Sequence, residues 1–295
     1  MTFLHMRFPG GRTKAVTLSY DDGVSQDLRL AELTARRGMK CTFNVNSGLV
    51  ASAPGGGKLT DEELRTGILA KGHEIAVHGE YHLAPGTSRT LVGLRDALNC
   101  RLQLEENLGE IIRGMAYPNS GITRFTGGSD YAAVRRYLQD IGIVYARSLG
   151  ADNNRFALPE DWYCWIPTAH HDNPNVLAWA REFAELRVND LYLDARWPRL
   201  FYLWGHSYEF DRNDNWAHIE ALCDLLGGRN DVWYATNVEI YDYVTAFRAL
   251  IFSADGTLCR NPTLLELFFE TDRGVTRVRP GETVKINAEC GMRNS

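Results

Sequence analysis

The sequence predicts an α/β fold built on a parallel sheet, and three observations favour it. Short β-rich apolar runs recur along the chain, helical patterns separate them, and capping residues or glycines mark several helix ends. Seven such strand–helix units fit within about 250 residues. This number of units favours an incomplete or distorted (β/α) barrel, with an open doubly wound sheet as the alternative.

The elements follow in order along the chain. Strands are expected at 15–20, 41–46, 74–77, 111–116, 144–147, 200–204 and 232–235. Helices are expected at 26–37, after residue 60, and at 90–108, 130–141, 176–186, 216–226 and 238–250. Gly38 closes the first helix, Thr60 and Glu63 have the spacing of a capping box, and Gly72 is placed to end the second helix.

The pattern changes after residue 250. Asn261-Pro262, Gly274 and Pro280-Gly281 interrupt short apolar runs, as in strands joined by tight turns. We therefore expect a barrel domain over residues 1–250 and a small β-rich C-terminal extension over residues 251–295.

Composition excludes several classes of protein. The 295 residues are 44% hydrophobic and 23% charged, and the net charge of -5 comes without a long run of one sign, so no nucleic-acid partner is expected. No apolar stretch reaches the roughly 20 residues that span a bilayer, and the N-terminus lacks the apolar core of a signal peptide. No membrane insertion and a cytoplasmic location are therefore expected. The six cysteines are scattered without a C-x-x-C pair, which favours reduced thiols.

Unusual polar residues follow the strands, where parallel β/α folds build their active sites. Asp21 and Asp22 end the first strand, and adjacent carboxylates repel each other unless a cation or metal compensates them. His78 and His82 follow the third strand, and on one helical turn both rings would face a common point. One Asp and two His make a typical open metal site, with positions left for water and substrate.

Two further histidines need separate interpretations. His206 follows the strand at 200–204 and could face the same mouth as the acidic pair and the two histidines. The run from His73 to His78 looks like the zincin H-E-x-x-H motif but is one residue too long, and on a strand these two side chains would point to opposite faces. His73 is therefore expected to be structural.

Three motifs together resemble the polysaccharide deacetylase family, also known as NodB-homology proteins or carbohydrate esterase family 4. They are Leu-Ser-Tyr-Asp-Asp-Gly at 18–23, Gly-His-Glu-Ile at 72–75 leading to His78 and His82, and Met-Ala-Tyr-Pro at 115–118. The match spans roughly residues 14–250. The resemblance implies a distorted (β/α) barrel of the NodB type that hydrolyses N-acetyl, or sometimes O-acetyl, groups on saccharides.

By motif position, the resemblance implies a role for each residue. Asp22, His78 and His82 would bind a divalent metal, most often Zn²⁺, with Co²⁺, Ni²⁺ or Mn²⁺ compatible with the same ligands. Asp21 would be the general base for a metal-activated water that attacks the acetyl carbonyl, and His206 the general acid. The metal and a backbone N–H near Asn119 would bind the oxyanion, and the adjacent Tyr117 and Pro118 complete that part of the substrate site.

The chain departs from the family pattern at three motifs. The usual arginine of the third motif aligns with Ala116, and Arg113 is the nearest candidate to orient the base. The usual aspartate of the fourth motif aligns with Cys164, which leaves Asp161 as the nearest carboxylate. His170 and His171, followed by an aspartate, could substitute in the relay or contact substrate, or simply form a surface loop.

In the last motif a tryptophan, Trp204, replaces the leucine that lines the acetyl pocket, so the acyl or sugar preference could differ. Aromatic rings stack well on sugar faces. Five candidates cluster around the predicted site, with Trp165 and Tyr208 leading: Trp162, Trp165, Trp204, Tyr208 and Trp216.

The leading hypothesis is therefore a carbohydrate deacetylase acting on an acetylated saccharide. One alternative is a hydrolase of another non-peptide C–N bond, in an amide or a cyclic ureide, on the same barrel. A second is a catalytically inactive carbohydrate-binding protein, which would have no need for Asp21, His206 and an open metal site together. A glycosidase fits poorly, because its two carboxylates stand several ångströms apart across the bond.

Overall fold

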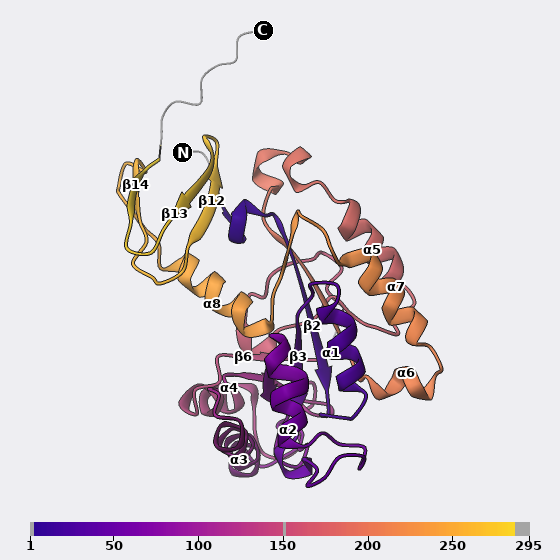
Figure 1. Ribbon diagram of the computed structural model, residues 1–295. Helices are drawn as coiled ribbons and strands as arrows, with labels where there is room; N and C mark the ends of the chain where they lie inside the picture. The colour runs from indigo at the N-terminus through magenta and orange to yellow at the C-terminus, as the bar shows by residue number, and fades with distance from the viewer. Residues whose placement is uncertain (1–2, 150–151, 287–295) are drawn as a thin grey trace.

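The computed structural model describes residues 3–149 and 152–286, and its centre is a curled parallel sheet (Figure 1). The strands run in the order β6-β5-β4-β3-β2-β8-β7, and β9 pairs with β2 outside this path. Their bounds are β2 (Lys14–Asp21), β3 (Cys41–Val45), β4 (Glu74–Val77), β5 (Gly114–Ala116), β6 (Tyr145–Arg147), β7 (Ala169–His170), β8 (Arg199–Gly205) and β9 (Val232–Tyr234). The predicted distorted barrel of parallel strands is confirmed.

Strand β2 is the centre of this sheet, and all eight of its residues are buried. One edge pairs with β8 from Lys14 to Tyr20. The other edge is shared, because β9 pairs with residues 14–16 and β3 with residues 18–21. The strand is covered on both faces although four of its residues are polar or charged, and its carboxyl end lies among the ends of its neighbours.

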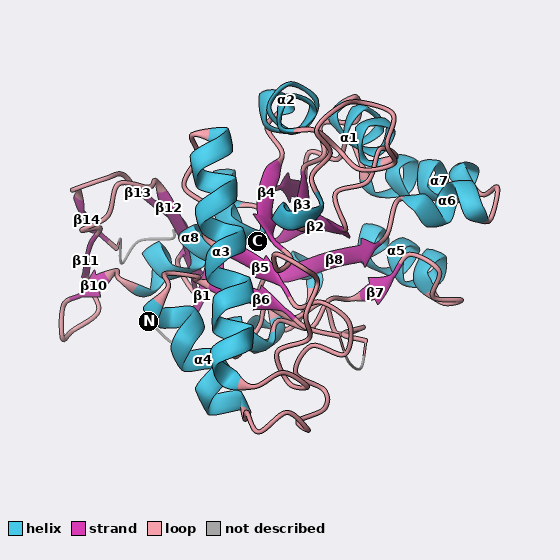
Figure 2. Ribbon diagram, turned by 90° about the horizontal axis from the view of Figure 1, so that it is seen from below, coloured by secondary structure: helices cyan, strands magenta, loops and turns pink. Residues whose placement is uncertain are grey.

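Helices surround the sheet (Figure 2). They are α1 (Asp27–Ala35), α2 (Asp61–Glu63), α3 (Thr90–Leu108), α4 (Tyr131–Asp140), α5 (Val176–Glu185), α6 (Tyr208–Arg212), α7 (Trp216–Leu226) and α8 (Asn237–Arg248). The capping box of Thr60 and Glu63 is present, and α2 continues as a π turn and a 3₁₀ turn until Gly72, in the left-handed region. Within the described residues, every helix is too short or too polar to cross a membrane.

Two small antiparallel sheets lie beyond α8 (Figure 1). One contains β1 (Leu4–Arg7), β12 (Leu267–Thr271) and β13 (Gly274–Val278), and the other contains β10 (Ile251–Phe252), β11 (Leu258–Arg260) and β14 (Thr283–Lys285). Thus 251–286 is β-rich as predicted, while residues 287–295 of the predicted extension lie outside the described residues. The division into domains at residue 250 stays a prediction.

The structure adds three elements to those predicted. Strand β1 was not predicted; it pairs antiparallel with β12, and its Arg7 forms a buried ion pair with Glu270 of that strand. Strand β7 is only two residues long, too short for an alternating pattern to appear. Helix α6 has five residues and begins shortly after β8, in a segment for which no helix was predicted.

Candidate active site

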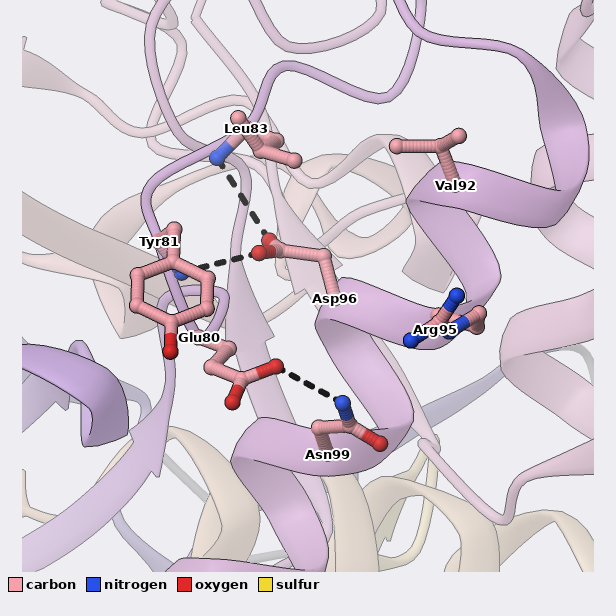
Figure 3. A pocket seen from close by; sticks show the side chains of 7 residues that line it. All are labelled: Glu80, Tyr81, Leu83, Val92, Arg95, Asp96 and Asn99. Carbon is pink, nitrogen blue, oxygen red and sulfur yellow. Dashed lines mark hydrogen bonds between the residues drawn. The ribbon is translucent and has the colours of Figure 1, made fainter.

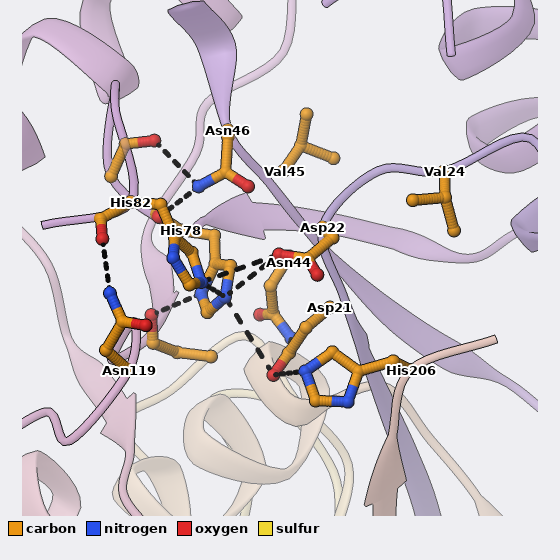
Figure 4. Close-up of polar contacts among 12 residues, drawn as sticks. Asp21, Asp22, Val24, Asn44, Val45, Asn46, His78, His82, Asn119 and His206 are labelled. Atoms are coloured by element: carbon orange, nitrogen blue, oxygen red, sulfur yellow. Dashed lines mark hydrogen bonds and ion pairs between the residues drawn. The ribbon is translucent and has the colours of Figure 1, made fainter. Parts of the chain in front are cut away.

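The polar residues of the site come from the carboxyl ends of four parallel strands, and Figure 4 shows Asp21, Asp22, His78 and His206 close together. Asp21 is the last residue of β2 and Asp22 follows it. His78 follows β4, Arg147 ends β6, and His206 follows β8. Since parallel strands end on one side of the sheet, these residues meet although they are far apart in sequence.

Asp22, His78 and His82 converge on one point. Asp22 Oδ1 lies 3.7 Å from His78 Nε2 and 3.5 Å from His82 Nε2, and the two Nε2 atoms are 3.1 Å apart. The predicted helical turn between the histidines is wrong, because residues 78–82 form a loop. The rings meet because Gly79 and His82 both take left-handed backbone angles, with φ of 78° and 59°.

Helix α3 anchors this loop through Asp96 (Figure 3). The Asp96 carboxylate accepts hydrogen bonds from the backbone N–H groups of Tyr81 at 2.8 Å and Leu83 at 3.4 Å. A Cβ at Gly79 would overlap Asp96 Oδ2, so this position requires glycine for space as well as for its φ. The anchor fixes the second histidine relative to the first.

The donor set suits a divalent metal. His78 Nδ1 donates a hydrogen bond to the carbonyl of Ala116 at 2.9 Å, which leaves the Nε2 lone pair directed at Asp22 and His82. Burial lowers the pKa of His78 to about 4, so its ring is neutral at physiological pH. Two imidazole nitrogens and one carboxylate fit Zn²⁺ and related ions. The side chains of Asp22 and His82 are 19% and 30% exposed, so the site is open to solvent.

Asp21 is buried beside this cluster and ionised. Burial alone would raise its pKa, but the charge of Arg147, with smaller contributions from His78 and His206, holds the pKa below its ordinary value. Arg147 Nη2 donates to Asp21 Oδ2, and Asn44 Nδ2 donates to Asp21 Oδ1 at 2.8 Å. The Nε2 atoms of His78 and His206 both lie 3.9 Å from Asp21 Oδ2.

The arginine that contacts Asp21 is Arg147, and the prediction of Arg113 at this position is wrong. Arg113 pairs with Asp242 of α8 at 2.9 and 2.5 Å. Arg147 is only 1% exposed, and its guanidinium lies over the Trp204 ring at 4.4 Å from the centroid. A signal for it was available, since Arg147 is the last residue of a predicted strand, where site residues were expected.

The carboxylate next to His206 is Glu209, and the prediction of Asp161 is wrong. His206 Nδ1 lies 3.4 Å from Glu209 Oε2. Asp161 instead accepts from the Tyr131 hydroxyl at 2.5 Å and from the backbone of Tyr163 at 2.9 Å. The signal for Glu209 was its position three residues after His206, which is adjacent only if a helix begins there.

His170 and His171 also reach this carboxylate. Their Nε2 atoms lie 3.1 and 3.3 Å from Glu209 Oε2. Both residues thus contact the partner of His206, and the surface-loop alternative is excluded for His171, which is completely buried.

The aromatic candidates divide into core and site residues. Trp165 is fully buried against Tyr145, Trp162 and Tyr202, so the prediction that it contacts substrate is wrong. Tyr117 is buried as well, and its hydroxyl donates to the carbonyl of Tyr163 at 2.9 Å.

Three other candidates lie at the mouth of the site. Trp204 and Tyr208 are partly exposed, with ring centroids 5.9 and 5.3 Å from that of His206. Exposed Asn119 has a φ of 51° and donates from Nδ2 to the His82 carbonyl at 2.8 Å, while Pro118 before it is buried.

Fold and site together define a parallel α/β half-barrel with an Asp–His–His centre beside an ionised carboxylate. Residues 9–144 match the family model described as Polysaccharide deacetylase. This match confirms the resemblance that the motifs indicate. No curated protein matches the sequence.

Solved structures share the architecture. A putative polysaccharide deacetylase from Mycobacterium smegmatis is 16% identical, with 82% of this chain and 93% of that chain covered and a TM-score of 0.55. The Puue allantoinase is 14% identical, with 80% of this chain and 91% of that chain covered and a TM-score of 0.53. These two likenesses show a common fold. The chain covers only 55% of a Streptococcus pyogenes deacetylase, with 45% of this chain aligned, 15% identity and a TM-score of 0.40.

Proposed function

We propose that this protein is a metal-dependent hydrolase that removes acetyl groups from an N-acetylated sugar, oligosaccharide or polysaccharide. One observation carries the proposal: the Asp22, His78 and His82 donors converge directly beside the buried, ionised Asp21, with His206 at the same mouth. A protein that only binds carbohydrate needs neither a desolvated base nor an open ligand set, so turnover explains the arrangement better than binding does.

Asp22, His78 and His82 would hold the metal, with Zn²⁺ as the first choice. The ion supplies a Lewis acid that polarises the acetyl carbonyl and makes water a better nucleophile at neutral pH. The hydrogen bond from His78 Nδ1 to the Ala116 carbonyl fixes the ring tautomer, so Nε2 is left with a lone pair that can bind a metal.

Asp21 takes the proton from the attacking water. Its carboxylate is anionic at neutral pH because Arg147 opposes the effect of burial, and Asn44 fixes its other oxygen. These two contacts hold both oxygens of the Asp21 carboxylate in place beside the ligand cluster. Arg147 is a positioning residue, since it acts through Asp21.

His206 gives a proton to the leaving amine, with Glu209 orienting its ring from Nδ1. Asn119 contributes a backbone N–H to the developing oxyanion, and its side chain ties it to the His82 loop. Trp204 and Tyr208, beside His206, offer flat surfaces to the sugar ring.

A second candidate is hydrolysis of another non-peptide C–N bond, as in a cyclic ureide. The shared fold with an allantoinase and the replacement of the usual relay aspartate by Glu209 favour it. In that case His206 would protonate a ring nitrogen, and the residues that activate water would be the same.

Acetate release from a panel of N-acetylated and O-acetylated saccharides tests the proposal. The protein is assayed as purified, after chelation, and after addition of Zn²⁺, with ring opening of a cyclic ureide measured in parallel. We expect acetate release that chelation abolishes and Zn²⁺ restores. Ureide opening without acetate release would select the second candidate, and no turnover with a bound ion would contradict both.

A further inference from the structure

A second group of metal-ligating side chains lies beside the candidate active site. It joins the end of β7 to helix α6 and contains His170, His171, Asp172 and Glu209, whose nearest donor atoms are all within 4.8 Å of one another. His171 Nε2 lies 3.3 Å from Glu209 Oε2 and 3.4 Å from Asp172 Oδ1. Nothing in the proposed reaction needs four such groups at one point.

Two of these residues have buried polar atoms without a hydrogen-bond partner among the described residues. His171 is 0% exposed, and neither of its ring nitrogens has a hydrogen-bond partner among the described residues. Glu209 is 9% exposed, and its Oε2 also lacks an aligned donor within the described chain, although three imidazoles surround it at 3.1 to 3.4 Å. Unpartnered buried polar atoms are costly, so atoms that face each other in this way indicate a missing ligand.

An ion pair does not explain the cluster. Burial, followed by the nearby His170 and His206, lowers the pKa of His171 to about 2, so its ring is neutral and carries a free lone pair. Arg212 neutralises only the other oxygen of Glu209, Oε1, at 2.9 Å.

The ring of His171 is held rigidly towards the carboxylates. It stacks on Tyr20 with an interplanar angle of 6° and packs against Phe210 at 4.4 Å between centroids. A Cβ at Gly205 would overlap His171 Nδ1, so the glycine between Trp204 and His206 makes room for this ring.

His170 plays a different part. Its Nδ1 accepts the backbone N–H of Asp172 at 3.1 Å, which leaves the proton of the neutral ring on Nε2. That N–H faces Glu209 Oε2 at 3.1 Å. His170 therefore presents no free lone pair to the cluster and is not a ligand.

We infer that His171 Nε2, Asp172 Oδ1 and Glu209 Oε2 form a second site for a divalent transition-metal ion such as Zn²⁺. The two measured separations from His171, 3.3 and 3.4 Å, agree with the edge of about 3.3 Å that tetrahedral bonds of about 2.0–2.1 Å produce. The Asp172 side chain is 35% exposed, which leaves an entry path and a position for water.

Occupancy of this site inhibits turnover, a consequence that rests on the proposed function. Glu209 Oε2 also lies 3.4 Å from His206 Nδ1, so an ion bound to this oxygen withdraws the carboxylate that orients the general acid. The first ion therefore supports the reaction, and the second suppresses it.

Titration of the chelator-treated full chain with Zn²⁺ alone, followed by calorimetry and by metal analysis after desalting, tests the second site without any substrate. We expect two equivalents per chain for the wild type. Asp172→Asn should weaken the second equivalent by at least about tenfold and leave the first unchanged. Asp22→Asn should lose the first equivalent and keep the second. Asp214→Asn, on an exposed turn, is the matched surface control and should bind two.

A single equivalent in the wild type would overturn the proposal, as would a second equivalent that survives Asp172→Asn unchanged. Acetate release at one and at five equivalents of Zn²⁺ then tests the inhibition. The ratio of the two rates should be well below one in the wild type and close to one in Asp172→Asn. Failure of all acetate release would count against the proposed function only, because the binding stoichiometry does not depend on it.

Discussion

The two sides of the mouth are built differently. On the side of β2 and β4, Asn44 and Arg147 donate hydrogen bonds to the Asp21 carboxylate, and His78 donates to the carbonyl of Ala116. On the side of β7 and β8, three imidazoles share one oxygen of Glu209 without aligned hydrogen bonds. The side of β2 and β4, which we propose is the water-activating side, is thus held by aligned hydrogen bonds, while the side of β7 and β8, which we propose is the proton-donating side, is not.

The largest expected effect is on the water-activating side. Asp21→Asn should lower kcat by about 10³-fold, in the range for loss of a general base, and leave the bound metal unchanged. Metal analysis and acetate release on the same preparation measure both properties. Asp22→Asn is the control that should lose both metal and activity. Full activity in Asp21→Asn would show that Asp21 is not the general base.

Arg147 should have the next largest effect. Arg147→Lys keeps a charge but loses the Nη2 hydrogen bond to Asp21, so we expect kcat to fall by about 10–100-fold with the fold intact by circular dichroism. Arg113→Lys is matched in chemistry and alters only the pair with Asp242, so its kcat should be that of the wild type. Equal losses in the two variants would contradict the assignment of Arg147.

A smaller effect is expected at Glu209. Glu209→Gln at one equivalent of metal should lower kcat by about tenfold, because His206 loses the carboxylate that orients it. Asp161 is the carboxylate nearest to Cys164 in the sequence, but its side chain contacts Tyr131. Asp161→Asn should therefore leave kcat unchanged. The reverse order of effects would return the orienting role to Asp161.

The smallest effect is expected at Asp27, whose contact with Ser207 links the segment after β2 to the segment after β8. Buried Asp27 accepts from Ser207 Oγ at 2.6 Å and from the backbone N–H of Val24 at 3.0 Å, and burial raises its pKa to about 8. Because the protonated form is favoured in the folded state, the stabilisation from Asp27 is complete below about pH 4 and is lost as pH rises to about 8.

Asp27→Asn has no titrating group at this position. The free energy of unfolding of the variant minus that of the wild type should therefore increase by at least about 1 kcal/mol from pH 5 to pH 8. Urea unfolding at several pH values measures the difference, with Asp214→Asn as the exposed control. A difference independent of pH would mean that Asp27 is ionised in the folded protein.

Most of the fold was predictable because short apolar runs alternate with longer helical patterns along the chain. The seven predicted strands are all present, and α3 has the predicted bounds of residues 90–108. The two-residue strand β7 and the five-residue helix α6 are too short for such a pattern, and β1 takes its partner from β12, over 250 positions away. Pairing over that separation leaves no local signal.

The site divides in the same way. The cluster of Asp22, His78 and His82 was predictable because each lies in a recognisable motif at a strand end. Arg147 and Glu209 were missed because their roles depend on which strands end side by side and on a short helix after His206. Trp165 was misassigned because its position in a motif says nothing about burial, which is complete.

The most direct test of the division between the two sides compares two leaving groups. kcat/KM is measured for an N-acetylated oligosaccharide and for 4-nitrophenyl acetate, whose leaving group departs without a proton. Asp21→Asn should impair both substrates by similar factors. His206→Ala and Glu209→Gln should impair the amide substrate, by about 100-fold and about tenfold respectively, and should have little effect on the ester. Equal losses on both substrates in His206→Ala would contradict the assignment of proton donation to this side.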